Sequence, residues 1–233
     1  MSTEPEEQPV LLVDDHSLFA QAVQIGLRAA GIPARPVAPR SAEDVVRTAT
    51  EAAPATVLLD LRLGTGEDGV PIDGLDLVAP LTQAGCRVVV VTGEIGDAIW
   101  GTALERGAVT VLPKDTDLGD LVRLLAAVRA GEAVLPDGRR QDLLAAARRA
   151  RAEEAARLAP FRHLSPREDQ VLRCLAAGMP AATIAATAHV SEATVRTQIR
   201  AVLTKLEVTS QLQAVALARR SGWLDLPAAV PAR

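Results

Sequence analysis

The sequence predicts two domains: an α/β domain built on a parallel, doubly wound sheet, followed by a smaller all-α domain. Three observations lead to this prediction. The chain has 233 residues, of which 48% are hydrophobic, which is enough for two packed cores. Short β-branched runs alternate with helical patterns as far as residue 131, which is typical of a parallel sheet with helical crossovers. From residue 161 onward the sequence shows helical patterns alone.

The α/β domain is predicted to contain five strands and five helices in alternation. The strand runs are too short for helices and unbroken enough to be buried on both faces of a sheet. Ser41 is expected to cap the second helix, and Gly31 and Gly131 to end the first and the last. The expected strands cover residues 10–13, 32–38, 56–59, 87–91 and 109–112, and the expected helices cover 17–30, 42–52, 75–84, 97–106 and 118–130.

Residues 132–160 are expected to form a helical linker. Pro136-Asp137-Gly138 predicts a turn, and the stretch from Arg139 to Leu158 is rich in Ala, Arg and Glu. Such a stretch favours a helix but has few large apolar residues to bury. A coiled-coil dimerisation segment is the alternative, although sustained Leu or Ile at heptad positions is missing.

Helix signals divide the all-α domain into four helices. Ser165 and Glu168 form a capping box with Pro166 at the first helical position, and Gly178 ends this helix. Ser191 is expected to cap the third helix after a tight turn, which predicts a helix-turn-helix. The later helices are expected over 181–188, 192–206 and 210–220. The predicted organisation is an α/β domain at 1–131, a linker at 132–160, a helix-turn-helix domain at 161–226 and a tail at 227–233.

Composition excludes several classes of function. Two cysteines and three histidines are too few for a disulfide framework or a His/Cys zinc site. Two Phe, two Trp and no Tyr make a stacking platform for single-stranded nucleic acid very unfavourable. No apolar run approaches the roughly 18 residues of a membrane-spanning helix, and the acidic N-terminus is unlike a secretory signal. A cytoplasmic protein without a membrane partner is therefore expected.

Charge is divided unevenly along the chain. Residues 1–131 hold 19 acidic and 10 basic side chains, a net charge of −9, and residues 132–233 hold 10 and 15, a net charge of +5. Together these give the −4 of the whole chain. An acidic half suits a divalent cation and a basic half suits a polyanion, so the two domains are expected to have different partners.

Polar side chains follow four of the five predicted strands. Asp14 and Asp15 follow the first strand and Asp60 follows the third. Thr92 follows the fourth, and Lys114 comes just after the fifth. The carboxyl ends of parallel strands meet at one edge of the sheet, and clustered carboxylates require a cation between them. Oxygen ligands select a hard ion, for which Mg²⁺ is the default.

These residues and their flanking runs resemble a bacterial response-regulator receiver domain. The resemblance rests on the five positions together with Val10 to His16, Val89 to Gly93 and Leu112 to Asp115. It implies a flavodoxin-like fold of five β-α units. It also implies that the protein accepts a phosphoryl group and has no enzymatic activity beyond slow autodephosphorylation.

The resemblance assigns a role to each residue of the set. Asp60 would be the phosphoacceptor. Asp14 and Asp15 would hold Mg²⁺ together with Asp60, and the backbone carbonyl of Arg62 would add a further ligand. Thr92 and Lys114 would bind the phosphoryl oxygens and report phosphorylation to the rest of the domain.

Two features depart from the receiver pattern. The loop from Gly64 to Ile72 is longer than usual before the pair Asp73-Gly74, and it has Gly64 where proline is usual. The position three before Lys114, which usually holds an aromatic residue, is Val111. An aromatic switch therefore cannot operate, and coupling is expected through Thr92 and movement of the following helix.

The predicted helix 192–206 has a buried stripe on one face and two arginines on the other. Arg196, Thr197 and Arg200 lie opposite the apolar residues. In a major groove, arginine binds phosphate or pairs bidentately with guanine. From charge alone, a solvated helix face is the alternative.

The wider pattern of this half resembles the LuxR-type helix-turn-helix. The matching runs are Leu164 to Glu168, Gly178, Val190 to Arg196 and Lys205-Leu206. Together with the receiver-like half, nearly the whole chain resembles a NarL/LuxR-type transcriptional response regulator.

The LuxR resemblance implies that Arg196, Thr197 and Arg200 face the groove and that Lys205 lies near the phosphates. It also implies sequence-specific binding to double-stranded DNA under the control of phosphorylation, a cognate sensor histidine kinase, and a homodimer through the last helix.

Two other functions remain open on the sequence. A DNA-binding regulator whose atypical receiver responds to a ligand or partner fits the long loop and Val111. A phosphatase with an aspartate nucleophile usually needs a general acid two residues after it, a position that is Arg62 here. The phosphatase is therefore the weaker alternative.

Overall fold

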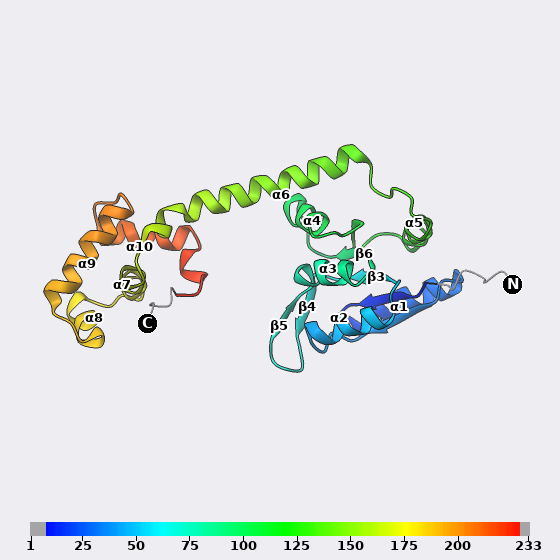
Figure 1. Ribbon diagram of the computed structural model, residues 1–233, viewed down its shortest axis with the longest axis horizontal. Coiled ribbons are helices and arrows are strands. Elements are labelled where there is room, and N and C mark those ends of the chain that lie inside the picture. The colour runs from blue at the N-terminus through cyan, green and yellow to red at the C-terminus, as the bar shows by residue number, and fades with distance from the viewer. Residues whose placement is uncertain (1–7, 229–233) are drawn as a thin grey trace. The chain divides into compact units, whose positions relative to one another are not determined.

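The computed structural model describes residues 8–228, and the chain divides into two compact units, Met1–Ala150 and Arg151–Arg233. Figure 1 follows the chain from the blue strands of the first unit to the orange and red helices of the second. The tail expected at 227–233 lies mostly outside the described residues. No helix within residues 8–228 is long and apolar enough to cross a membrane.

A five-stranded parallel sheet forms the centre of the first unit, as predicted. Its strands are β1 (Val10–Val13), β2 (Ala34–Val37), β3 (Thr56–Leu59), β6 (Arg87–Thr92) and β7 (Thr110–Pro113). The order in the sheet is β2-β1-β3-β6-β7, so the direction of winding reverses between β1 and β3. Such a reversal opens a crevice at the carboxyl ends of the strands, where sites form in open α/β sheets.

Five helices cover the sheet on both faces, close to their predicted bounds. They are α1 (Ser17–Ala29), α2 (Ala42–Glu51), α3 (Gly74–Gln83), α4 (Asp97–Glu105) and α5 (Leu118–Ala130). Successive strand residues point to opposite faces. Leu11 and Val13 therefore belong to the core shared with α2, α3 and α4, whereas Val10 and Leu12 belong to the core shared with α1 and α5.

The segment expected as a long loop after the third strand is instead a β-hairpin. Its strands are β4 (Arg62–Thr65) and β5 (Pro71–Asp73), paired antiparallel and labelled in Figure 1. Leu63 and Ile72 are buried in the core, which gives the hairpin one apolar face. At its tip, the backbone N–H of Glu67 donates to the carbonyl of Arg40 at 2.7 Å. The burial of Leu63 and Ile72 on one face and this hydrogen bond at the tip hold residues 62–73 in a hairpin.

The linker helix is longer and better packed at its start than the sequence predicted. Helix α6 spans Asp137–Leu158, and its residues up to Ala150 belong to the first unit. Leu143 and Ala147 are each 1% exposed, and Leu143 belongs to the sheet core. The expectation that this helix has little to bury is therefore wrong for its first turns, because two residues one turn apart suffice for a close contact.

As far as residue 228, the second unit contains the end of α6, the four predicted helices and two 3-10 segments, Ala159–His163 and Trp223–Asp225. The helices are α7 (Pro166–Ala176), α8 (Ala181–Ala188), α9 (Glu192–Lys205) and α10 (Gln211–Arg220). The predicted capping box is present, since the Ser165 N–H donates to Glu168 Oε2 at 2.6 Å and the Glu168 N–H donates to Ser165 Oγ at 3.4 Å. The 3-10 segments bring Phe161 and Trp223 into a stack with ring centroids 5.0 Å apart, which the sequence did not predict.

Candidate functional site

Strand pairing brings three carboxylates to one edge of the sheet. β1 pairs in register with β3, so that Val13 lies opposite Leu59, and the Asp60 N–H donates to the Val13 carbonyl at 2.9 Å. Asp14 and Asp15 therefore lie beside Asp60. One ligand atom from each of these residues lies within 4.8 Å of the others. The structure thus brings together the three acids that the sequence selected.

Lys114 lies across the same edge and contacts two of the carboxylates. Its backbone N–H donates to the Thr92 carbonyl at 3.0 Å, which fixes the end of β7 beside β6. Its Nζ lies 2.7 Å from Asp60 Oδ2 and 2.8 Å from Asp14 Oδ2. Burial lowers the pKa of Lys114, but the hydrogen bonds to Asp14 and Asp60 outweigh it and the net pKa is raised. Lys114 is therefore held as a cation.

Asp60 keeps one carboxylate oxygen for chemistry. Its side chain is only 2% exposed, and Oδ1 has no hydrogen-bond partner in the described structure. A buried, unpaired carboxylate oxygen is costly unless a ligand, ion or water satisfies it. The set of oxygen donors fits a hard divalent cation such as Mg²⁺, and Asp14, Asp15 and Asp60 are the residues that would hold it.

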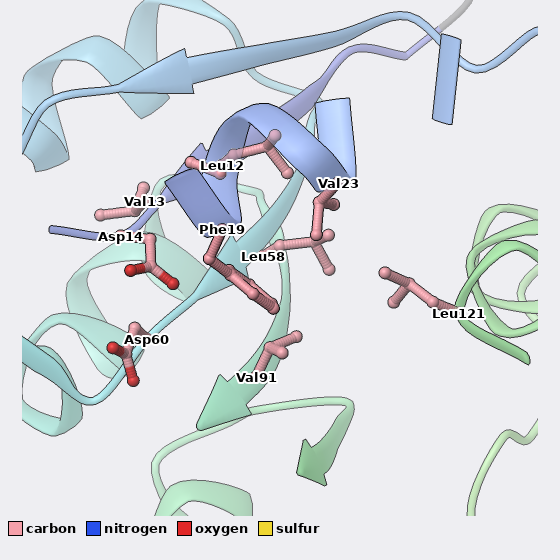
Figure 2. Close-up of a pocket in the computed structure, with 10 residues that line it drawn as sticks. Leu12, Val13, Asp14, Phe19, Val23, Leu58, Asp60, Val91 and Leu121 are labelled. Carbon is pink, nitrogen blue, oxygen red and sulfur yellow. The ribbon is translucent and has the colours of Figure 1, made fainter. Parts of the chain in front are cut away.

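Two further residues at this edge were not predicted as site residues. His16 Nδ1 lies 2.7 Å from Asp15 Oδ1 and 3.4 Å from Lys114 Nζ. The Phe19 ring lies beneath Lys114, with its centroid 4.9 Å from Nζ. In Figure 2 the carboxylates of Asp14 and Asp60 lie on one side of the Phe19 ring, and the side chains of Val23 and Leu121 lie on the other. The sequence signal for His16 and Phe19 was their position just after Asp15, around the start of α1.

Two glycines allow the backbone to approach the acids. A Cβ on Gly74 would lie 2.0 Å from the Asp60 carbonyl oxygen, so only glycine permits this contact after Asp73. Gly64 has φ +66°, and a Cβ there would lie 3.2 Å from Asp15 Oδ2. The hairpin therefore passes directly beside the acidic cluster, and the positive φ at position 64 excludes proline, whose ring holds φ near −65°.

Thr92 is fully buried and linked to the loop that follows β6. Its Oγ1 accepts a hydrogen bond from the Glu94 N–H at 3.1 Å. The Glu94 carboxylate pairs with the guanidinium of Arg62, so the side chain of Arg62 spans from the hairpin to this loop. The resemblance to receiver domains implied a role for the backbone carbonyl of Arg62 alone. Binding of a phosphoryl oxygen by Thr92 would require its hydroxyl group to become exposed.

Val111 occupies the position at which receiver-like sequences usually place an aromatic residue. It is 6% exposed and belongs to the core on the side of α2, α3 and α4. An isopropyl group in this core cannot exchange between inward and outward positions as a large ring could. Any conformational coupling between Thr92 and the helices must therefore use contacts other than a side-chain switch at position 111.

In the second unit, α9 has the predicted apolar and polar faces. Ser191 caps it by accepting from the Thr194 N–H at 3.1 Å, and Val195 and Ile199 are buried. Arg196 and Arg200 are exposed. A short helix, a tight turn and a second helix with arginines on its outer face have the geometry of a major-groove reader.

The other candidate DNA-binding residues differ in their availability. Arg196 donates from Nε and Nη2 to Glu192 Oε1 at 3.0 and 2.6 Å, and Thr197 Oγ1 donates to the Ala193 carbonyl at 3.0 Å. Lys205 Nζ lies 2.6 Å from Glu168 Oε2. Arg196, Thr197 and Lys205 are all exposed, but the Lys205 ammonium also links α9 to α7 through Glu168.

Comparisons with known families agree with both units. Residues 10–126 match the model described as response regulator receiver domain, and residues 162–218 match the model described as bacterial regulatory proteins, luxR family. The chain therefore belongs to the response regulators that join a receiver domain to a LuxR-type helix-turn-helix domain. This confirms the resemblance seen in the sequence.

Relatives align along nearly the whole chain. The nitrate/nitrite response regulator protein NarL of Escherichia coli K12 is 30% identical over 209 residues, which cover 90% of this chain and 94% of NarL. The regulator BvgA of Bordetella pertussis is 30% identical over 215 residues, which cover 91% of this chain and 97% of BvgA. The structure of an RcsB–DNA complex covers 92% of this chain and 98% of its own, at 20% identity and a TM-score of 0.49.

Proposed function

We propose that this response regulator is phosphorylated on Asp60 and that phosphorylation controls sequence-specific binding of double-stranded DNA by α9. The observation that carries the proposal is the unpaired Oδ1 of the buried Asp60, beside two further carboxylates and a lysine. A nucleophile, oxygen donors that would suit a divalent cation and a counter-charge for phosphate are therefore available within one crevice. The partner supplying the phosphoryl group would be a sensor histidine kinase, as the receiver family implies.

The residues divide the work of phosphoryl transfer. A carboxylate oxygen of Asp60 attacks phosphorus while the bond from phosphorus to the donor breaks, and the donor leaves with that bond's electron pair. The ammonium of Lys114 would leave Asp60 Oδ2 and donate a hydrogen bond to a phosphoryl oxygen, which carries negative charge. Thr92 would donate its hydroxyl hydrogen to another phosphoryl oxygen. Mg²⁺, when held by Asp14, Asp15, Asp60 and the carbonyl of Arg62, would neutralise charge on the transferred group.

The DNA-binding half of the proposal rests on α9. Arg196, Thr197 and Arg200 are exposed on one helix, where two arginines can contact base edges or phosphates. Lys205 would reach phosphate only by leaving Glu168. Leu212 is 79% exposed on α10, which supports the proposal that this helix forms a homodimer contact. A regulator that binds chromosomal DNA would act in the cytoplasm.

The first experiment is intact mass spectrometry of the full chain after incubation with Mg²⁺ and acetyl phosphate. We expect the mass of one added phosphoryl group on the native protein and none on Asp60→Asn. Asp73→Asn, at the end of the hairpin, is the matched control and should still be loaded. Loading of Asp60→Asn would contradict the assignment of the phosphoacceptor.

The second experiment selects bound fragments from bacterial genomic DNA with the phosphorylated full chain. Enrichment of a common sequence is expected to fall strongly for Asp60→Asn and for Arg200→Ala. If the native protein takes no phosphoryl group yet enriches the same sequence, control by a ligand or partner replaces control by phosphorylation. The hairpin beside the acids and Val111 in the core are the features that would favour that outcome.

A further inference from the structure

The start of α6 contacts α4 backbone to backbone. Gly101, in the middle of α4, is buried, and a Cβ on it would lie 2.0 Å from the Leu143 carbonyl oxygen and 2.9 Å from the Ala147 Cβ. Both partner residues are 1% exposed. Only glycine at position 101 allows the two helices to come this close. We refer to the contact of Gly101 with Leu143 and Ala147 as the α4–α6 seam.

Charged pairs fix both ends of the seam. At the start of α4, Arg139 donates two hydrogen bonds to the Asp97 carboxylate, at 2.7 and 3.0 Å. These bonds lower the pKa of Asp97. At the end of α4, Arg148 lies 3.8 Å from Glu105. Because contacts advance along both helices together, α4 and α6 run in the same direction and are held along the length of α4.

Trp100 connects α4 to the site around Asp60. The Trp100 indole N–H donates to the Glu94 carbonyl at 2.9 Å, and the Glu94 N–H donates to Thr92 Oγ1 at 3.1 Å. Two hydrogen bonds therefore lead from the residue that would bind a phosphoryl oxygen to the residue that precedes Gly101. Trp100 is also packed against the core that contains Leu143.

We propose that Trp100 is a positioning residue that passes the phosphorylation state of Asp60 from Thr92 to the α4–α6 seam. When Thr92 turns its hydroxyl toward a phosphoryl group, the hydrogen bond from Glu94 is lost and the Glu94 carbonyl moves. The Trp100 side chain moves with this carbonyl because it is hydrogen-bonded to it. α4 then shifts against α6 at the α4–α6 seam, where the two helices are in close contact. The proposal rests on phosphorylation of Asp60. It gives Trp100 the coupling of Thr92 to the helices that an aromatic residue at position 111 would otherwise provide.

The test is hydrogen exchange of the full chain, with and without Mg²⁺ and acetyl phosphate, read at the backbone amides of residues 139–148. In the native protein, phosphorylation is expected to change their exchange rates at least several-fold. Trp100→Phe keeps most of the ring but loses the indole N–H. In this variant we expect normal loading of Asp60, read by intact mass, and loss of most of the exchange response.

The chain supplies a matched control for this substitution. Trp223 is its only other tryptophan, and it stacks on Phe161 in the second unit. Trp223→Phe should leave the exchange response of residues 139–148 unchanged. A full response in Trp100→Phe, or an equal loss in Trp223→Phe, would overturn the role given to Trp100.

A second pair of variants tests the seam itself. Gly101→Ala places a methyl group where the Leu143 carbonyl lies, so residues 139–148 are expected to exchange faster in both phosphorylation states. Gly138→Ala adds the same group to α6 with nothing within 4 Å and should not accelerate exchange. If Gly101→Ala exchanges like the native protein, the seam does not hold α6 and the proposal falls.

The outcomes separate this inference from the proposed function. A phosphorylated native protein with no change at residues 139–148 would overturn the role of the seam and leave phosphorylation of Asp60 standing. Absence of any phosphoryl adduct would overturn the proposed function, and the inference would fall with it.

Discussion

At the residue scale, the acidic cluster shows how neighbours prepare a group for reaction. Asp14 and Asp60 are almost fully buried, and Lys114 satisfies one oxygen of each. Two carboxylates this close repel each other, so the pair depends on the positive charge beside it. The oxygen of Asp60 that Lys114 does not reach is the one left without a partner.

A first prediction at this scale concerns metal binding. Mg²⁺ should raise the melting temperature of the first unit, by the equivalent of about 2.7 kcal/mol at a hundredfold excess over its Kd. In the double variant Asp14→Asn, Asp15→Asn this rise should be absent in differential scanning calorimetry. Asp115→Asn with Asp142→Asn removes the same charge from exposed positions and should keep the rise. A loss in both double variants would point to general charge screening.

A second prediction concerns Glu168, which accepts hydrogen bonds from the Ser165 N–H and Lys205. Burial raises its pKa, but the bonds from Lys205 and Ser165 outweigh it and the net pKa is lowered. Because the pKa is lower in the folded state, the stabilisation is present above the unfolded value of about 4.3 and is lost as the pH falls through the folded value.

Glu168→Gln should therefore lower the free energy of unfolding of the second unit by about 1.5–3 kcal/mol at neutral pH. Its effect should shrink as the pH falls below the unfolded pKa of the glutamate. Urea unfolding at several pH values measures this in a Trp100→Phe background, in which Trp223 is the single tryptophan and its fluorescence reports the second unit. Glu207→Gln, at an exposed position, should be nearly neutral. An effect of Glu168→Gln that is independent of pH would contradict the ionic contribution.

At the element scale, the β4–β5 hairpin and the first turns of α6 are the two features that shape the first unit around its site. The hairpin passes beside Asp15 and is held at its tip through Arg40. α6 is held along α4 by Gly101 and two ion pairs. One element lies beside the acids, and the other contacts α4, the helix that follows Thr92.

The hairpin yields a third prediction. Gly64→Ala and Gly69→Ala both place a side chain at positive φ, of +66° and +77°, which costs about 1–2 kcal/mol of stability each. Only the methyl group at position 64 would meet Asp15. The rate of phosphorylation by acetyl phosphate, followed by intact mass, should therefore fall in Gly64→Ala and stay near native in Gly69→Ala. Equal rates in the two variants would show that the hairpin does not affect the site.

At the scale of the whole molecule, the two units differ in the sign of their net charge as well as in the kind of site they contain. The first unit, residues 1–150, has 22 acidic and 14 basic side chains and a net charge of −8, and the second unit, residues 151–233, has 7 and 11 and a net charge of +4. A positively charged unit gains affinity for DNA through release of counterions, so its binding depends on salt. The two halves are expected to respond to different solution conditions, Mg²⁺ in one case and salt in the other.

A fourth prediction uses this dependence to assign the two arginines of α9. Arg200→Ala should reduce the slope of log affinity against log salt by about 1 if Arg200 contacts phosphate, or cost about 1–3 kcal/mol at one base pair if it reads a base. Arg196→Ala should have a smaller effect on the slope, because Glu192 already neutralises Arg196. Binding of an enriched DNA sequence at several salt concentrations gives both numbers. Arg157→Ala, in an exposed part of α6, is the control.

Most of the fold could be predicted because its signals are local. Runs such as Val88 to Val91 predict buried strands wherever they occur, and caps such as Ser41 and Ser191 act within one turn of their own position. The acidic cluster could be predicted as well, since parallel strands that end in Asp14, Asp60 and Thr92 must meet at one edge. In each case the information needed lies within a few residues of the element concerned.

The sequence by itself was therefore enough to predict the five strands of the parallel sheet, the helices, and the meeting of Asp14, Asp15, Asp60 and Lys114 at one edge of that sheet. Tertiary structure alone decided that the segment after Asp60 is a hairpin held by Arg40, that α6 packs on α4 at Gly101, and that Lys205 binds Glu168. The physical reason is distance along the chain. Contacts between residues tens of positions apart depend on how elements pack, and neither periodicity nor capping specifies which glycine or lysine will meet which partner.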